Sequence, residues 1–401
     1  MCAVGFALDF AAMAAMTAVP FFVFNQLGGG AQMSGLFGAS QGALYTIVCL
    51  ASASVVQRSR NGLDWAIGGM AGFGILVFAG AFFRSPVASG ALFAAGIASL
   101  GFVWPALHSW VGAHPDPHIR ARRMSWFNIS WSFGFALSPL VAGPLYDVDY
   151  RFPFVLVLGL VMAIIALVRS VPHERDVHTA DEAPEDVDAA RIEHSEQFIP
   201  MSIAGLTVAT ALGSITRTIF PKRIDELVTA GQLRLLGEAS PLPALTHASA
   251  TKYSWLAFGL SVASACTFLI LGRTKRWQHN AGLALGLQSL AALSFWFLGS
   301  TRSLCVMLLC FVTVGANIGL AFFSSLFYCV ANPDHKHRRA AINEGAVGTG
   351  GLVGSLVLGY LVERFGHAAP YQCIPVTVAL AVVVQLALLR AGRSRRPRSG
   401  T

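Results

Sequence analysis

Twelve apolar runs, each about 20 residues long, constrain the fold of this chain more than any other feature of its sequence. They cover residues roughly 2–26, 34–56, 65–83, 86–111, 124–146, 152–171, 198–219, 253–272, 279–300, 303–331, 340–362 and 369–390. About 20 mainly apolar residues let an α-helix cross the hydrocarbon core of a bilayer, and a helix pairs its backbone polar groups internally. Runs of this length do not fit the alternating strands of about 10 residues that form outer-membrane barrels. We therefore predict an all-α polytopic membrane protein with twelve transmembrane helices.

The composition excludes the other broad protein classes. Of the 401 residues, 55% are hydrophobic and only 12% are charged, whereas a soluble domain has about 25% charged residues. A soluble chain of this kind would lack the polar side chains that cover a water-exposed surface. The seven cysteines form no CxxC pair and no disulfide framework, and the sequence contains no HExxH motif. We therefore expect neither a metal site nor a cofactor.

Basic residues are concentrated in the short loops on one side of the predicted membrane. These loops and the C-terminal tail contain Arg58, Arg60, Arg120, Arg122, Arg123, Arg273, Lys275, Arg276, Lys336, Arg338, Arg339, Arg390, Arg393, Arg395, Arg396 and Arg398. The short loops on the other side contain only Arg84, Arg151, Arg302 and Arg364. Because cytoplasmic loops are enriched in Lys and Arg, we predict a plasma (inner) membrane protein with both termini in the cytoplasm. The division of the basic residues among separate loops does not favour nucleic-acid binding.

A strongly acidic segment separates two groups of six apolar runs. Residues 174–196 contain nine acidic residues against two arginines, and such a stretch cannot bury enough apolar surface to fold by itself. We predict a six-helix bundle over residues 1–172, an acidic cytoplasmic linker over 173–197, a second six-helix bundle over 198–391 and a basic tail over 392–401. The outer segment 217–252 mixes charged and apolar residues, and it fits either an amphipathic surface helix or a plain loop.

The two groups of runs repeat each other in sequence. An offset of 216 residues pairs Gly134 with Gly350, Gly143 with Gly359, Asp147 with Glu363, and Arg122 and Arg123 with Arg338 and Arg339. Weak internal symmetry of this kind is common in membrane proteins that are built from two related halves. The repeat therefore predicts two pseudo-symmetric six-helix bundles.

The fifth run contains the motif Gly134-x3-Ser138-Pro139-x2-Ala142-Gly143. This motif resembles the glycine–proline signature of the fifth helix in the major facilitator superfamily. The six-plus-six arrangement, the charged central loop and the basic loops are also similar to that superfamily, over nearly the whole chain. The loop after the second span departs from it, because Gln57 precedes Arg58 where the superfamily usually has an acidic residue, and Arg60 occupies a glycine position. The resemblance implies a secondary active transporter that moves a sugar-, drug- or metabolite-like solute by alternating access.

The resemblance also implies candidate residues for the conformational change and for the substrate cavity. The candidates for conformational change are Arg58, Arg122, Arg123, Gly134, Pro139, Gly143, Arg338, Arg339, Gly350, Gly354 and Gly359. The first, fourth, seventh and tenth spans are expected to line a central cavity. Including their neighbours, the candidate cavity residues are Gln41, Tyr45, Trp104, Trp126, Asn128, Trp131, Thr207, Thr210, Ser214, Arg217 and Asn317. Aromatic faces with a few hydrogen-bonding groups suit organic solutes, although ordinary packing also accounts for each aromatic residue.

Four of these candidates form a polar stripe in the seventh span. Thr207, Thr210, Ser214 and Arg217 follow the spacing i, i+3, i+7 and i+10, which places them on one face of a helix. One interpretation is that the stripe lines the cavity. The other is that the hydroxyl groups bond back to their own helix and pack as small residues.

Asp9 and Glu344 are acidic residues within predicted spans, where ionisable groups are costly and normally face protein or water. Together with His108, a residue type that changes charge near neutral pH, they are the candidate sites of proton coupling. The alternatives are hydration of Asp9 near the membrane surface, an ion pair of Glu344 with Arg338 or Arg339, and a structural role for His108. We expect the partners to be a small-molecule substrate, the lipid bilayer and protons, and the protein to act as a monomer.

Two other hypotheses belong to different functional classes. The sequence Gly38-Ala39-Ser40-Gln41-Gly42 matches the GxSxG motif of a nucleophile. That motif needs a strand before it and a helix after it, whereas here it lies inside the second apolar run, so we do not expect an enzyme. The second hypothesis is a sensor that retains the fold but moves no solute.

Overall fold

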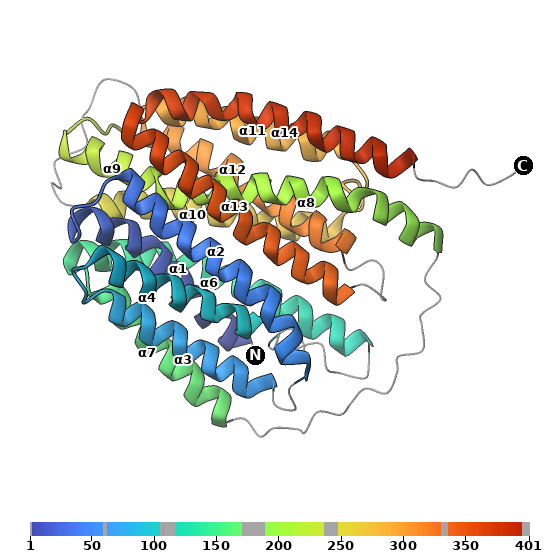
Figure 1. The fold of residues 1–401 in the computed structure, drawn as a ribbon, viewed down its shortest axis with the longest axis horizontal. Helices are drawn as coiled ribbons and strands as arrows, with labels where there is room; N and C mark the ends of the chain where they lie inside the picture. Colours follow the sequence, from blue (N-terminus) through green and yellow to red (C-terminus); the bar gives the residue numbers. More distant parts are fainter. Residues whose placement is uncertain are drawn as a thin grey trace, which may run out of the picture.

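The computed structural model describes residues 2–58, 62–104, 107, 117–170, 189–235, 248–329 and 336–394. Within these ranges, long helices run side by side along one axis (Figure 1). The first group contains α1 (Cys2–Asn25), α2 (Ala31–Arg58), α3 (Gly62–Gly80), α4 (Pro86–Ser99), the 3-10 turn η1 (Leu100–Phe102), α6 (Pro117–Val148) and α7 (Phe152–Ser170). The second group contains α8 (Ala189–Thr218), the short α9 (Phe220–Thr229), α10 (Ser249–Arg273), α11 (Ala281–Ser300), α12 (Leu304–Cys329), α13 (Lys336–Phe365) and α14 (Ala368–Ser394).

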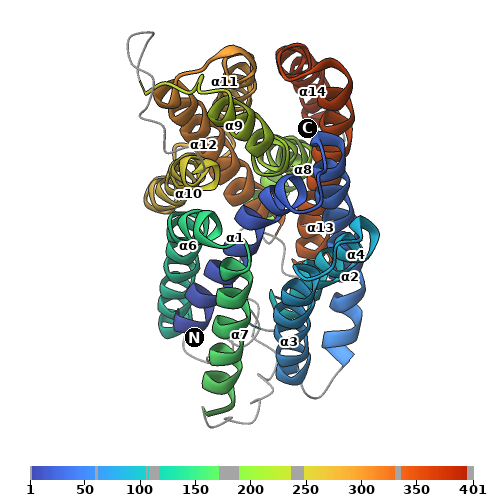
Figure 2. The same ribbon diagram turned by 90° about the vertical axis from the view of Figure 1, so that its left-hand side faces the viewer.

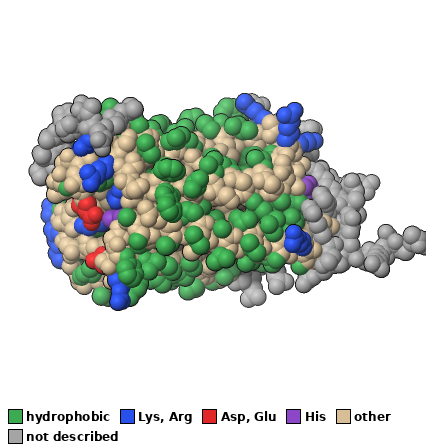
Figure 3. Space-filling model, turned by 90° about the horizontal axis from the view of Figure 1, so that it is seen from above, with side chains coloured by type: hydrophobic (Ala, Val, Ile, Leu, Met, Phe, Trp, Pro, Cys, Tyr) green, Lys and Arg blue, Asp and Glu red, His purple; other side chains and the backbone are tan. Residues whose placement is uncertain are grey.

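The long helices coincide with the predicted apolar runs, so the prediction of an all-α membrane protein is confirmed. Among the described residues, nine helices are long and apolar enough to cross a membrane, and two shorter apolar helices are Asp64–Gly80 and Pro86–Phe102. Charged side chains gather at the two ends of the bundle, and apolar side chains cover much of the surface between them (Figure 3). Leu309 is 67% exposed and Leu380 is 65% exposed, as expected for side chains that face lipid. The chain is therefore a multi-pass integral membrane protein.

The ends of several helices follow from local sequence. The side chain of Ser85 accepts a hydrogen bond from the Ala88 backbone N–H at the start of α4, and Pro86 occupies the first turn, as is typical of a helix N-terminus. Asn280 caps α11 in the same way, because its Oδ1 accepts from the Leu283 N–H at 3.0 Å. Gly366 follows α13 with a φ of 70°, a left-handed conformation that favours glycine after a helix.

The short helix α9 resolves the alternatives left open for the outer segment. Its apolar residues Phe220, Ile224 and Leu227 are buried against the bundle, while Arg223 donates a hydrogen bond to the Thr301 carbonyl at 3.0 Å. The segment 220–229 is therefore an amphipathic helix, and residues 236–247 lie outside the described ranges. We call this end of the bundle the α9 end (left in Figure 1).

Helix α8 begins at Ala189, inside the segment predicted as an acidic linker. Ser195 is buried there, and Glu196 forms an ion pair with Arg339 at 2.9 Å. These contacts stabilise the last residues of the acidic segment as part of α8. Residues 171–188 of the predicted linker lie outside the described ranges.

Pairs of glycines at the 216-residue offset occupy equivalent positions in the two groups of helices. A Cβ on Gly134 of α6 would lie 2.1 Å from the Phe6 carbonyl oxygen of α1, and a Cβ on Gly350 of α13 would lie 2.3 Å from the Thr207 carbonyl oxygen of α8. Only glycine permits backbones to approach so closely. Helix α6 thus packs on α1 as α13 packs on α8, which confirms the predicted pseudo-symmetry of the fold.

The same offset relates the contacts between the two groups. A Cβ on Gly143 of α6 would lie 2.6 Å from the Ala250 carbonyl oxygen of α10, and a Cβ on Gly359 of α13 would lie 2.9 Å from the Ala31 carbonyl oxygen of α2. Figure 2 shows the result, with α6 beside α10 on one side and α2 beside α13 on the other. We call these contacts the α6–α10 seam and the α2–α13 seam.

A carboxylate closes each seam at the α9 end. Asp147 at the end of α6 accepts hydrogen bonds from the Thr251 backbone N–H (2.7 Å), the Thr251 hydroxyl (2.6 Å) and the Ala250 N–H (3.4 Å) in the first turn of α10. Glu363 near the end of α13 accepts one hydrogen bond, from the Gln32 N–H in the first turn of α2 (3.2 Å). Both carboxylates lie at helix N-termini, where the helix dipole favours negative charge.

Candidate functional site

Close packing of backbones brings polar side chains together across the α2–α13 seam. A Cβ on Gly42 would lie 2.7 Å from the Gly348 carbonyl oxygen and 2.8 Å from the Leu352 nitrogen. Small residues allow transmembrane helices to approach in this way. The GxSxG match belongs to this seam, since Ser40 lies within the continuous helix α2 and donates to the Phe37 carbonyl at 2.9 Å. These residues therefore pack helices together and lack the geometry of a nucleophile elbow.

Tyr45 and Glu344, two predicted site residues, meet across this seam. The Tyr45 hydroxyl of α2 donates a hydrogen bond to Glu344 Oε2 of α13 at 3.2 Å. Arg339, which the sequence offered as a partner for Glu344, instead pairs with Glu196, and the side chain of Arg338 lies outside the described residues. Glu344 lies deep in the bundle but remains partly accessible. The acid therefore bridges the two groups of helices.

Asp9 occupies the interior of α1, next to the contact between α1 and α6. Its neighbour Phe10 accepts a hydrogen bond from the Ser138 hydroxyl of α6 through its carbonyl oxygen, at 2.6 Å. Asp9 itself is deep in the bundle and partly accessible. Its Oδ2 has no hydrogen-bond partner in the part of the chain that the structure describes. A carboxyl group in such surroundings is either protonated or, if ionised, needs water or a cationic partner.

The hydroxyl groups of the polar stripe in α8 pack against α13. Thr207 donates to the Ile203 carbonyl at 3.0 Å and Thr210 to the Leu206 carbonyl at 2.8 Å. Ser214 bonds to the Gly351 carbonyl at 3.1 Å and also contacts the Ser355 hydroxyl. The stripe thus runs along the α8–α13 contact, with the back-bonding that the sequence had offered as one of its two interpretations.

Arg217, the last residue of the stripe, differs from the hydroxyl groups. Its guanidinium lies over the ring of Phe135 of α6, 5.1 Å from the ring centroid. Its Nε has no hydrogen-bond partner among the described residues, although the side chain is deep in the bundle. A cation–π contact contributes about 0.5–2 kcal/mol, which is less than the several kcal/mol that an unpaired buried charge costs.

The remaining predicted residues are dispersed. Trp126 is 56% exposed, Trp131 stacks edge-on against Phe268 of α10 at 5.8 Å, and Trp104 packs against the core. Gln41 lies one turn from Tyr45 on α2 and is partly accessible. His108 and the side chains of Arg58, Arg122, Arg123 and Asn128 lie outside the described residues.

The glycines and the proline predicted for conformational change lie within helix contacts. Pro139 lies inside α6. A Cβ on Gly354 of α13 would lie 2.4 Å from the Ala211 carbonyl oxygen of α8. Together with Gly350, Gly354 allows α13 to pack closely against α8, the helix that contains the polar stripe.

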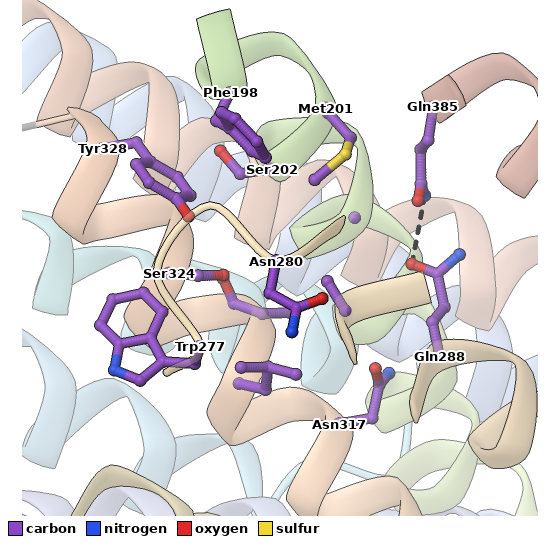
Figure 4. Close-up of a pocket in the computed structure, with 14 residues that line it drawn as sticks. Phe198, Met201, Ser202, Trp277, Asn280, Gln288, Asn317, Ser324, Tyr328 and Gln385 are labelled. Carbon is purple, nitrogen blue, oxygen red and sulfur yellow. Dashed lines mark hydrogen bonds between the residues drawn. The ribbon is translucent and has the colours of Figure 1, made fainter. Parts of the chain in front are cut away.

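A separate polar pocket lies inside the second group of helices, and it contains Asn317 (Figure 4). Gln385 of α14 donates a hydrogen bond to Gln288 Oε1 of α11 at 3.1 Å, and both side chains are nearly fully buried. Gln288 Nε2 and Asn317 Nδ2 have no partner among the described residues. The cavity of about 30 Å³ has room for one or two water molecules, which would satisfy these donors.

The sequence reasoning missed Gln288 and Gln385. Each is an amide in the interior of an apolar run, and a polar residue in a transmembrane helix is the signal that would have found them. The structure also separates Asn317 from Tyr45 and Glu344, because Asn317 lies in this pocket and the other two lie at the α2–α13 seam.

The fold and these contacts define a polytopic membrane protein with two related helical halves that meet along two seams. The sequence profile described as Major Facilitator Superfamily matches residues 1–331. This chain therefore belongs to the major facilitator superfamily, a family of transporters. Among curated proteins, none matches the chain.

Several solved transporter structures share this fold over almost their entire length. They include a POT family transporter in complex with a thioalcohol-conjugated peptide (14% identity, TM-score 0.73, 98% of this chain and 95% of that chain). The nucleoside transporter NupG is similar at 10% identity (TM-score 0.70, 96% and 97%). A bacterial homologue of the human lysosomal transporter Spinster, in an inward-facing and unoccupied conformation, is similar at 14% identity (TM-score 0.69, 98% and 96%). At these identities the similarity shows the fold alone.

Proposed function

We propose that this protein is a secondary active transporter that moves a small organic solute by alternating access and couples this movement to protons. The observation that carries the proposal is the burial of two acidic side chains, Asp9 and Glu344, deep in the bundle with part of each side chain still accessible. Intramembrane acids of this kind mark ion and proton pathways in membrane proteins.

Glu344 provides a physical link between proton binding and the movement of the halves. Its carboxylate accepts a hydrogen bond from Tyr45 across the α2–α13 seam. A hydrogen bond to a charged acceptor is stronger than one to a neutral acceptor. A proton on Glu344 would therefore weaken the seam and favour its opening.

In the proposed cycle the halves rock against each other about the two seams. The present structure is the state in which Asp147 and Glu363 tie the halves together at the α9 end. We assign the α9 end to the outside and both termini to the cytoplasm of a plasma membrane protein, on the distribution of basic residues. We further propose that the monomer is the transporting unit.

The test is a double substitution, Asp9→Asn with Glu344→Gln, in purified protein reconstituted into liposomes. Vesicles loaded with a pH-sensitive dye report proton entry when an organic solute is added outside. A thermal-stability screen selects that solute, because ligands that bind the folded state stabilise it. We expect solute-dependent proton movement in the wild type and its loss in the double variant. Solute exchange without a pH gradient should persist in that variant.

Two results would contradict the proposal. Undiminished proton-driven uptake in the double variant would place coupling at other residues. Binding of solutes without any flux in the wild type would instead favour the sensor hypothesis. The matched control is Asp64→Asn, which removes an acid from the first turn of α3 and should leave coupling unchanged.

A further inference from the structure

Arg217 is a cation deep in the bundle, and it has no acidic partner among the described residues. Within the described residues, its guanidinium lies over the Phe135 ring and interacts electrostatically with Tyr253, and its Nε has no hydrogen-bond partner. Tyr253, whose hydroxyl lies in the same region, donates to the Thr216 carbonyl at 3.0 Å. The phenol of Tyr253 is neutral, so it supplies no anionic charge to balance Arg217.

The described carboxylates that lie at the interface between the halves are engaged elsewhere or lack a cationic partner. Asp147 accepts hydrogen bonds from the first turn of α10, and Glu363 accepts one from α2. Glu344 accepts from Tyr45, while Asp9 makes no ion pair within the described residues. An unpaired buried charge costs several kcal/mol, so a buried guanidinium normally pairs with an anion.

Arg217 lies where the two halves meet, so a ligand bound to it would lie next to both halves. The residue belongs to α8 in the second half, while Phe135 belongs to α6 in the first. The side chain is surrounded by protein and yet partly accessible. An anion bound there would contact one half directly and the other through the aromatic ring.

We propose that Arg217 forms an anion-binding subsite, and that the transported solute carries a carboxylate or phosphate group. This inference rests on the proposed transport function and narrows its substrate class. A guanidinium offers two parallel N–H donors to the oxygens of such a group, which gives geometric specificity as well as charge. Sugars and other neutral solutes would not use this residue.

The test compares anions with neutral molecules of the same shape. The apparent melting temperature of the detergent-purified protein is measured with benzoate and benzamide, succinate and succinamide, and glycerol 3-phosphate and glycerol, at constant ionic strength. We expect at least one anion to stabilise the wild type, and its neutral counterpart to have no effect. Arg217→Gln should weaken the binding of that anion at least tenfold, and Arg217→Lys should restore part of it.

Arg364→Gln is the matched control. Arg364 also lies over a phenylalanine ring, that of Phe365 at 5.8 Å, but it is exposed. Its loss removes the same charge and should leave anion binding as in the wild type. If Arg217→Gln is not monodisperse, Arg217→Met, which keeps an apolar stem on Phe135, replaces it.

Three outcomes would overturn the inference: no stabilisation by any of the anions, equal stabilisation by the neutral counterparts, or unchanged anion binding in the Arg217 variants. The fate of the proposed function is measured separately in liposomes. Proton-driven uptake of a neutral solute would leave the transport proposal intact and refute the anion subsite. Anion binding through Arg217 without flux would support the subsite and refute transport.

Discussion

The α6–α10 and α2–α13 seams occupy equivalent positions in the fold, but they are built from different chemistry. Asp147 closes the α6–α10 seam with three hydrogen bonds, whereas Glu363 closes the α2–α13 seam with one. The α2–α13 seam also contains a second acid bonded across it, Glu344, which lies deep in the bundle and not at its end. The two seams therefore share the pseudo-symmetry of their backbones and differ in their side chains, because three hydrogen bonds tie the α6–α10 seam while the α2–α13 seam contains the acid that we propose to bind protons.

The first prediction disrupts the α2–α13 seam by forcing its two backbones apart. Gly42→Ala adds a Cβ that would lie 2.7 Å from the Gly348 carbonyl oxygen and 2.8 Å from the Leu352 nitrogen, so α2 and α13 must move apart. Overpacked sites lose about 1–3 kcal/mol, and we expect a fall of several degrees in the apparent melting temperature. Gly351→Ala is the control, because its Cβ would meet its nearest atom only at 4.0 Å. Equal effects of the two substitutions would contradict the packing of this seam.

The second prediction weakens the α6–α10 seam, which Asp147 holds with three hydrogen bonds. Asp147→Asn removes the charge that accepts three hydrogen bonds in the first turn of α10. Hydrogen bonds to charged groups contribute about 1.5–3 kcal/mol, and we expect a loss of about 1–2 kcal/mol because the amide still accepts one bond. The amides of Ala250 and Thr251 should exchange with deuterium faster, which mass spectrometry measures on peptides from residues 248–260. Unchanged exchange there would show that Asp147 does not hold the seam.

The third prediction has the smallest effect. Glu363→Gln removes a charge that accepts one hydrogen bond, from the exposed Gln32 N–H at 3.2 Å. The expected loss is about 0.5 kcal/mol, at the low end for a hydrogen bond, with slightly faster exchange in the first turn of α2. An effect as large as that of Asp147→Asn would show that the two seams are equally tied and would remove the distinction drawn between them.

The interiors of the two halves also differ in polarity. In the first half, α7 and its neighbours meet through apolar and aromatic side chains, with Phe154 against Phe22 at 6.0 Å and Phe93 at 5.6 Å. In the second half, Gln288, Asn317 and Gln385 surround a small polar pocket. Polar groups inside a helical bundle need hydrogen-bond partners, so we expect water within the second half.

Most of the fold was predictable because its causes are local. Each apolar run is long enough to cross a bilayer, and a helix satisfies its own backbone polar groups. The repeat of glycines at an offset of 216 residues predicted the pseudo-symmetry, and the structure places Gly134 and Gly350 in equivalent contacts. For the segment 217–252, sequence alone did not decide between a helix and a loop, since the apolar face of α9 becomes favourable only against the bundle.

The candidate site was predictable in its members but not in their arrangement. Tyr45 and Glu344 both stood out as polar residues in apolar runs, yet no local pattern relates two side chains that are 299 positions apart. Asn317 was grouped with the cavity residues, whereas it lies with Gln288 and Gln385 in a pocket of its own. Spacing along one helix identifies a face, but the neighbouring helix determines what that face meets.

The sequence by itself determined the membrane class, the approximate positions of the twelve spans and the relationship between the two halves. These properties depend on the length and polarity of continuous segments, which the bilayer selects directly. Only the tertiary structure decided that Glu344 meets Tyr45, that Asp147 and Glu363 cap helices of the opposite half, and that Arg217 lies over Phe135. Such contacts arise where backbones approach within a few ångströms at glycines, and that approach depends on the packing of all the helices together.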